Sequence, residues 1–146
     1  MTIGLRTMCR PNELYKLKLK DIKFGRKLCW IRIGHSKTDQ FTNRKFISIE
    51  YSNSPYCPIK LLKKYLTNRP KSSSDKPLFL SKQGKQLSVR AIGAIVKRIA
   101  NNASIQDRFT AHSIRISGIT TAMEAGLSLT QIRAIGAGTV KQLCYT

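Results

Sequence analysis

The chain has 146 residues, with 27 Lys and Arg against 7 Asp and Glu, so its formal net charge at pH 7 is +20. Its 41% hydrophobic and 23% charged residues suffice for the core of one domain and exclude the composition of a disordered chain. The apolar runs are all shorter than the ~18 residues that cross a bilayer, and no signal-peptide pattern stands at the start, which excludes a transmembrane span and a secretory signal.

The first half of the chain predicts a short helix followed by a small sheet. Pro11 suits a first helical turn, and Leu14 and Leu17 share one face, so we expect a helix from Pro11 that gives way to a turn before residue 24. Residues 29–33 and 45–49 are β-rich runs and predict an antiparallel sheet of two or three strands. Residues 35–40 between them are polar and typical of a strand or turn.

Helical spacing dominates the second half. Pro58 opens a helix to residue 66, residues 69–77 predict an exposed loop, and Ser88 caps a helix whose apolar residues reach 99. Further helices are expected over residues 111–125, stopped by Gly126, and from 128 or 130 to about 136. Residues 140–145 predict one or two more helical turns. The fold class is therefore α+β, a mostly helical single domain with a small antiparallel sheet.

The cysteines are too scattered for a metal site or a disulfide scaffold. They contain no C-x-x-C pair and no His at zinc-finger spacing. We expect reduced cysteines in an intracellular protein. The four are Cys9, Cys29, Cys57 and Cys144.

The net charge points to a polyanionic partner. A folded chain at +20 repels itself unless a polyanion is near, and nucleic acid is the common one. An anionic membrane surface would favour basic residues gathered on one amphipathic helix, whereas these are spread along the chain, so we expect no membrane partner. A ribosomal-type RNA-binding protein fits the charge equally well and stays open on charge alone.

Two clusters could hold a phosphate. His112 and Arg115 are three residues apart at the start of a predicted helix, where free backbone N–H groups also attract anions. Arg10 opens the pattern R-P-x-E-L-x-x-L at the head of another helix, and Glu13 is spaced to orient it.

At these motifs the sequence resembles the catalytic domain of the tyrosine recombinases, or phage integrases. The segment TMCRPNEL at residues 7–14 resembles the first arginine box, with Met8 where Gly is common, and TAHSIR at residues 110–115 resembles the A-H-x-x-R box. The small-residue run that follows and its EAG ending at 124–126 also match, as do SKT at 36–38 and PLFL at 77–80.

The resemblance implies site-specific DNA recombination or integration, by strand cleavage and rejoining through a phosphotyrosyl intermediate. The implied catalytic residues are two phosphate-clamping arginines, a proton-handling histidine, a lysine acid and a nucleophile: Arg10, Arg115, His112, Lys37 and Tyr145. It implies no metal and no cofactor. It also implies double-stranded DNA as partner, a homotetramer on two DNA sites, and a location with DNA inside the cell, in the bacterial cytoplasm and nucleoid or a eukaryotic nucleus.

Compared with the family pattern, the chain lacks several parts. We expect residues 1–146 to be a catalytic domain without the N-terminal core-binding domain, the first helices and the tail helix. The family places a His or Trp shortly before its tyrosine, and residues 134–140 contain neither. The sequence therefore leaves a second reading open, a catalytically inactive DNA-binding remnant of the same fold.

Overall fold

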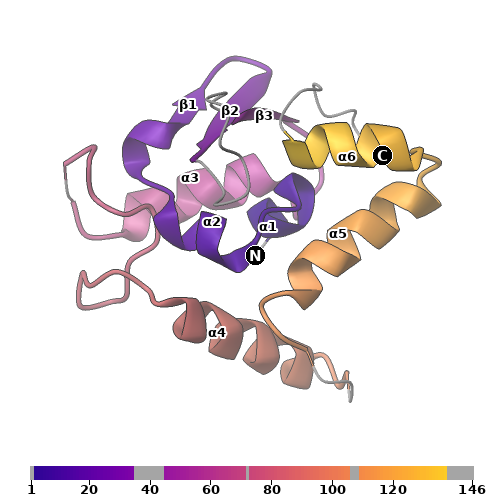
Figure 1. Ribbon diagram of the computed structural model, residues 1–146. Coiled ribbons are helices and arrows are strands. Elements are labelled where there is room, and N and C mark those ends of the chain that lie inside the picture. The colour runs from indigo at the N-terminus through magenta and orange to yellow at the C-terminus, as the bar shows by residue number, and fades with distance from the viewer. Residues whose placement is uncertain (1, 35–44, 72, 106–108, 138–146) are drawn as a thin grey trace.

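The computed structural model describes residues 2–34, 45–71, 73–105 and 109–137 (Figure 1). Within these ranges a three-stranded antiparallel sheet is joined by six α-helices and one 3-10 helix, Leu19–Asp21, which confirms the predicted α+β class. In chain order the helices and strands are α1 (Thr2–Thr7), α2 (Pro11–Lys16), β1 (Ile22–Phe24), β2 (Leu28–Ile33), β3 (Lys45–Glu50), α3 (Pro58–Asn68), α4 (Val89–Asn102), α5 (Ser113–Glu124) and α6 (Leu129–Ala137).

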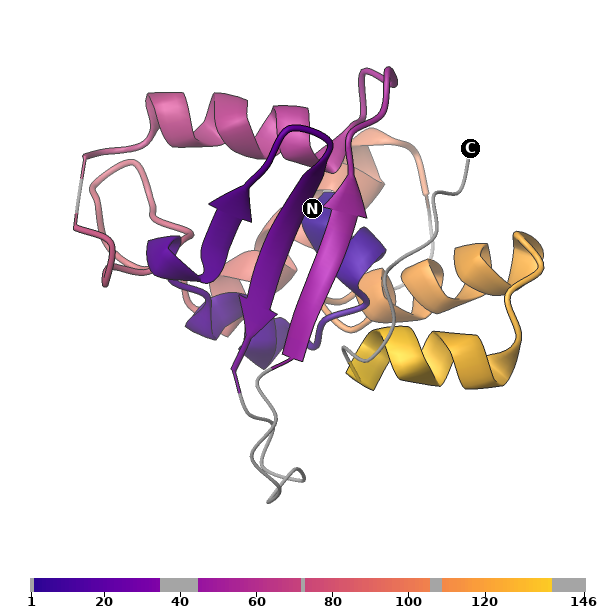
Figure 2. The ribbon, with the colours of Figure 1, turned by 90° about the horizontal axis from the view of Figure 1, so that it is seen from above.

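The sheet has the order β1-β2-β3, and one of its faces builds the main core. Ile31 on the central strand pairs with Ile22 of β1 and Ile47 of β3. Ile31 and Ile47 are buried in one cluster with Ile59 and Leu62 of α3, so α3 covers the inner face of the sheet. Figure 2 looks onto the sheet from above and shows the three strands side by side, with α5 and α6 to the right of them.

Local signals set the ends of the longer helices as predicted. Ser88 caps α4, because its Oγ accepts a hydrogen bond from the N–H of Ala91 at 3.1 Å. Gly126, with φ +84°, ends α5, and the N–H of Leu127 returns to the carbonyl of Ala122 at 3.0 Å. At the start of α6 the Oγ of Ser128 accepts from the N–H of Gln131.

Three features differ from the predictions. The sequence did not indicate helix α1, and the segment expected to be a turn ends in strand β1. The loop over residues 69–77 is not exposed throughout: Arg69 is only 8% exposed, and its Nη2 donates to the carbonyl of Pro77 at 3.1 Å. The aliphatic part of an arginine side chain can be buried while its guanidinium donates to a carbonyl, and the composition of a loop does not predict this.

A second, smaller core joins α5 and α6 to the turn between α1 and α2. It is a buried cluster of Met8, Ala122, Ile132 and Ile135. Helix α5 also lies directly on α1, and a Cβ built on Gly118 would overlap the carbonyl oxygen of Leu5. Glycine is required at this crossing because no larger residue fits against the α1 backbone.

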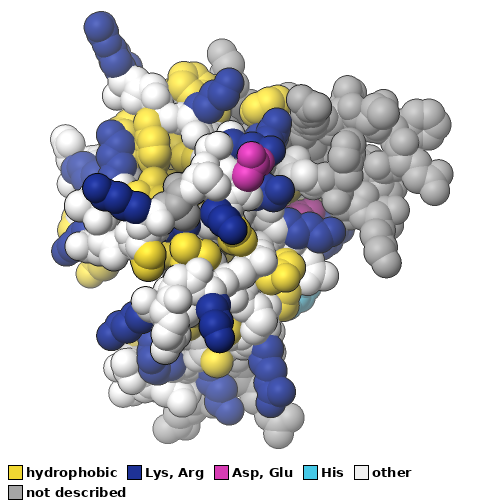
Figure 3. Space-filling view, turned by 90° about the vertical axis from the view of Figure 1, so that its left-hand side faces the viewer, with side chains coloured by type: hydrophobic (Ala, Val, Ile, Leu, Met, Phe, Trp, Pro, Cys, Tyr) yellow, Lys and Arg dark blue, Asp and Glu magenta, His cyan; other side chains and the backbone are white. Residues whose placement is uncertain are grey.

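The described surface carries many basic side chains, and the interior holds three of the four cysteines. Figure 3 shows Lys and Arg side chains scattered over the described part of one face, with few acidic side chains among them. Cys9, Cys29 and Cys57 are buried thiols that form no disulfide, while Cys144 lies outside the described residues. Burial raises the pKa of the Cys29 thiol to about 11, against a smaller opposing effect of Lys63. No helix in the described ranges is long and apolar enough to cross a bilayer.

Candidate functional site

The start of α5 meets the turn between α1 and α2, and an arginine side chain joins them. Nη1 of Arg115 donates a hydrogen bond to the main-chain carbonyl of Met8, across 107 positions of sequence. Arg115 is partly buried there. Two residues beyond Met8 stands Arg10, so the structure brings Arg115 to the segment that carries Arg10.

Met8 can present its carbonyl to Arg115 because its backbone is left-handed. Its φ is +50°, and its side chain is 1% exposed. This conformation costs a residue with a Cβ roughly 1–2 kcal/mol, which the burial of a large apolar side chain offsets. The side chain lies against α5, since its Cγ would be 3.3 Å from a Cβ built on Gly118.

Arg10 occupies the N-cap of α2 and is held by Glu13. The carboxylate of Glu13 accepts from the Arg10 N–H at 2.6 Å through Oε2 and from Arg10 Nη1 at 3.4 Å through Oε1. The Arg10 side chain is 49% exposed, while that of Glu13 is 13% exposed. Glu13 therefore orients Arg10, whose side chain stays half exposed to solvent.

His112 occupies the N-cap position of α5, and its side chain is exposed. Its carbonyl accepts from the N–H of Arg115 at 3.0 Å and of Ile116 at 3.2 Å, which closes the first turn. The helix is 12 residues long, so its N-terminus adds a favourable potential for an anion beside the imidazole. Arg115 lies in this first turn, in agreement with the three-residue spacing.

Lys37 and Tyr145 lie outside the described residues. The structure thus places Arg10 at the N-cap of α2 and His112 and Arg115 at the start of α5, with Arg115 bonded to the Met8 carbonyl two residues before Arg10. The expected acid and nucleophile stay predictions. Among the described residues, no group of three His, Cys, Asp or Glu is placed to hold a metal ion.

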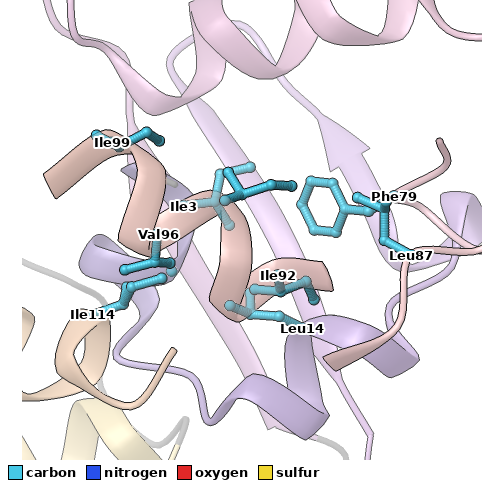
Figure 4. Close-up of a pocket in the computed structure, with 10 residues that line it drawn as sticks. Ile3, Leu14, Phe79, Leu87, Ile92, Val96, Ile99 and Ile114 are labelled. Atoms are coloured by element: carbon cyan, nitrogen blue, oxygen red, sulfur yellow. The ribbon is translucent and has the colours of Figure 1, made fainter. Parts of the chain in front are cut away.

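An apolar cavity of about 120 Å³ lies between α1, α2, α4 and α5 (Figure 4). The side chains of Ile3, Leu14 and Ile114 line it, and none of the lining residues is charged. Its chemistry does not suit a phosphate, so the cationic helix starts remain the candidate site.

Sequence reasoning missed the parts that Met8 and Gly118 play here. Met8 had a visible signal, since it stands where the resembled family commonly has Gly, a residue suited to positive φ. Gly118 had only the small-residue composition of its helix as a signal.

Comparison with known proteins identifies the family. The model of the phage integrase family matches residues 1–137. A tyrosine recombinase of Synechococcus elongatus is 30% identical over 120 residues, covering 80% of this chain and 35% of the relative. The tyrosine recombinase XerC of Caldanaerobacter subterraneus is 30% identical over 129 residues, covering 86% of this chain and 33% of the relative.

Solved structures agree on the fold. The XerH site-specific recombinase in its pre-cleavage complex with difH substrate superposes with a TM-score of 0.71 at 22% identity, covering 92% of this chain and 37% of that chain. The XerA recombinase gives a TM-score of 0.71 at 22% identity, covering 92% of this chain and 45% of that chain. The chain spans about a third of the length of the curated relatives it matches. With a family match over nearly all of its residues and the two arginine boxes joined in space, the chain belongs to the phage integrase family of tyrosine recombinases.

Proposed function

We propose that the chain is the catalytic region of an enzyme of site-specific DNA recombination, which cleaves and rejoins strands through a phosphotyrosyl intermediate. The observation that carries the proposal is the hydrogen bond from Arg115 to the Met8 carbonyl, two residues from Arg10. It brings together, within a chain of this family, the two cationic motifs that the chemistry needs.

The two arginines would clamp the non-bridging oxygens of one phosphodiester. A guanidinium presents parallel N–H groups that match two phosphate oxygens, and it stays charged at every relevant pH. Arg115 uses Nη1 on the Met8 carbonyl, which leaves its other N–H groups for the phosphate. Negative charge that develops in the transition state is thus met by donors already in place.

The remaining steps need a nucleophile, a base and an acid. The Tyr145 oxygen would attack phosphorus and form the phosphotyrosyl bond as the bond to the 5′ oxygen breaks, with His112 taking or holding the phenol proton. Lys37 would protonate the leaving 5′ oxygen. The reverse attack by a 5′ hydroxyl reseals the strand and returns the proton, so the two half-reactions balance.

The proposed partner is double-stranded DNA, which a chain at +20 binds through its phosphates. Two structurally similar proteins support DNA as the partner, because their structures were solved as DNA complexes. They are XerH with difH substrate and the Tn1549 integrase with circular intermediate DNA. We further propose that residues 1–146 form a catalytic domain and that four copies act together on two DNA sites, inside the cell where the DNA is.

The test is covalent trapping on a nicked suicide duplex, from which the cleaved strand end diffuses away. We expect the wild type and Tyr56→Phe to form a protein–DNA adduct and Tyr145→Phe to form none. Tyr56 is the matched control because it is 75% exposed and precedes α3.

Each other result would refute part of the proposal. An adduct from Tyr145→Phe would exclude Tyr145 as the nucleophile. Salt-sensitive duplex binding by the folded wild type without any adduct would show an inactive DNA-binding remnant. Preference for structured RNA over duplex DNA at matched salt would refute DNA as the partner.

A further inference from the structure

Met8 contacts two different parts of the molecule, one with its backbone and one with its side chain. Its carbonyl accepts the hydrogen bond from Arg115 Nη1. Its side chain belongs to the buried cluster that holds α6 through Ile132 and Ile135, which are 6% and 1% exposed. One residue therefore touches the phosphate-clamping arginine with its backbone and the packing of α6 with its side chain.

The backbone of Met8 alone does not explain this residue type. At φ +50° glycine is the unstrained choice, because it has no Cβ to crowd the following carbonyl. The residue in this conformation is nevertheless a methionine, and it is only 1% exposed and packs with residues of α5 and α6. The side chain thus anchors the strained turn, and the turn sets the direction of the carbonyl.

We propose that Met8 is a positioning residue for DNA cleavage, coupling the docking of α6 to the orientation of the Arg115 guanidinium. When Ile132 and Ile135 pack on its side chain, the left-handed turn is held and its carbonyl fixes one nitrogen of Arg115. The other guanidinium N–H groups then point in one direction. The inference rests on the proposed function, and it links the arginine to the helix that precedes Tyr145 in the sequence.

The test compares three variants in single-turnover cleavage of the nicked duplex at saturating DNA. Met8→Gly accepts the positive φ but removes the anchor, whereas Met8→Leu keeps a side chain of similar volume. Leu62→Ala is the matched control, because Leu62 belongs to the buried cluster under the sheet and not to the cluster that contains Met8. All are measured at a temperature at which circular dichroism shows them folded.

We expect Met8→Gly to cleave about 10²-fold more slowly, because a small misplacement of a group that orients the substrate lowers the rate by about this factor. Its affinity for the duplex should change by less than about threefold. Met8→Leu should restore most of the rate. Leu62→Ala should lose stability but keep its rate per folded molecule. A wild-type rate in Met8→Gly, or equal losses in Met8→Gly and Leu62→Ala, would overturn the inference.

A second readout does not depend on activity. In nuclear magnetic resonance spectra, rotation of the Arg115 guanidinium should be restrained in the wild type and in Met8→Leu, and free in Met8→Gly. If Met8→Gly retains the restraint, the coupling is refuted. If the wild type forms no adduct while this pattern holds, the proposed function fails and the coupling stands.

Discussion

The crossing of α1 and α5 at Gly118 can be tested with one added methyl group. In Gly118→Ala the new Cβ would overlap the carbonyl oxygen of Leu5 and lie 3.2 Å from its carbonyl carbon. These are backbone atoms of α1, which cannot rotate away as a side chain does. The two helices must therefore separate, and the bond from Arg115 to the Met8 carbonyl spans the same contact.

Two effects compete in this substitution. Alanine is favoured over glycine in a helix interior by about 1 kcal/mol, while overpacking against a fixed neighbour costs about 3 kcal/mol. The net expectation is a loss of about 2 kcal/mol, equivalent to a fall in Tm of about 4–8 °C for a domain near this size. Cleavage of the nicked duplex should fall as well, because Arg115 loses its fixed partner.

Gly93→Ala supplies the matched control. Gly93 is also inside a helix, α4, but a Cβ there would meet nothing closer than the Ala111 Cβ at 3.8 Å, an ordinary contact. Thermal unfolding should therefore show Gly93→Ala raised in stability by about 0.5–1 kcal/mol and Gly118→Ala lowered. If both glycines gain stability on replacement, the close approach of α1 and α5 is wrong.

Three further outcomes are expected. Asp21→Ala leaves the partly buried Arg32 without the carboxylate that accepts from its Nε at 2.8 Å. Urea unfolding should show a fall of about 1.5–3 kcal/mol in the free energy of unfolding. The double variant Asp21→Ala, Arg32→Met should recover part of this loss, because it no longer buries an unpaired charge. The pKa of Cys29 is about 11 in the folded chain against 9.0 for the ordinary thiol, so the unfolded state loses its proton first as the pH rises. The free energy of unfolding should therefore fall between pH 9 and 11 by about 2–3 kcal/mol more in the wild type than in Cys29→Ala. Equal slopes of this free energy against pH in the two proteins would exclude the thiol as the cause. Arg115→Lys cannot both donate to Met8 and fork onto a phosphate, so single-turnover cleavage should fall about 10²–10³-fold, and an unchanged rate would remove Arg115 from the clamp.

The sequence by itself determined the features that depend on neighbouring residues. The cap of α4 at Ser88 and the end of α5 at Gly126 were predicted because capping and helix termination are decided within a few positions. The same holds for the two longer strands, whose β-rich runs are local. Family resemblance added the grouping of Arg10, His112 and Arg115.

Only the tertiary structure decided how these pieces meet. The left-handed turn at Met8, the burial of Arg69 and the need for Gly118 at a helix crossing all depend on partners distant in the sequence. The bond from Arg115 to Met8 spans 107 positions, and no local pattern encodes the direction of a carbonyl that far away. Helices and caps follow from short-range sterics and hydrogen bonds, whereas the contact between the first turn of α5 and the segment before α2 forms only when the buried clusters pack.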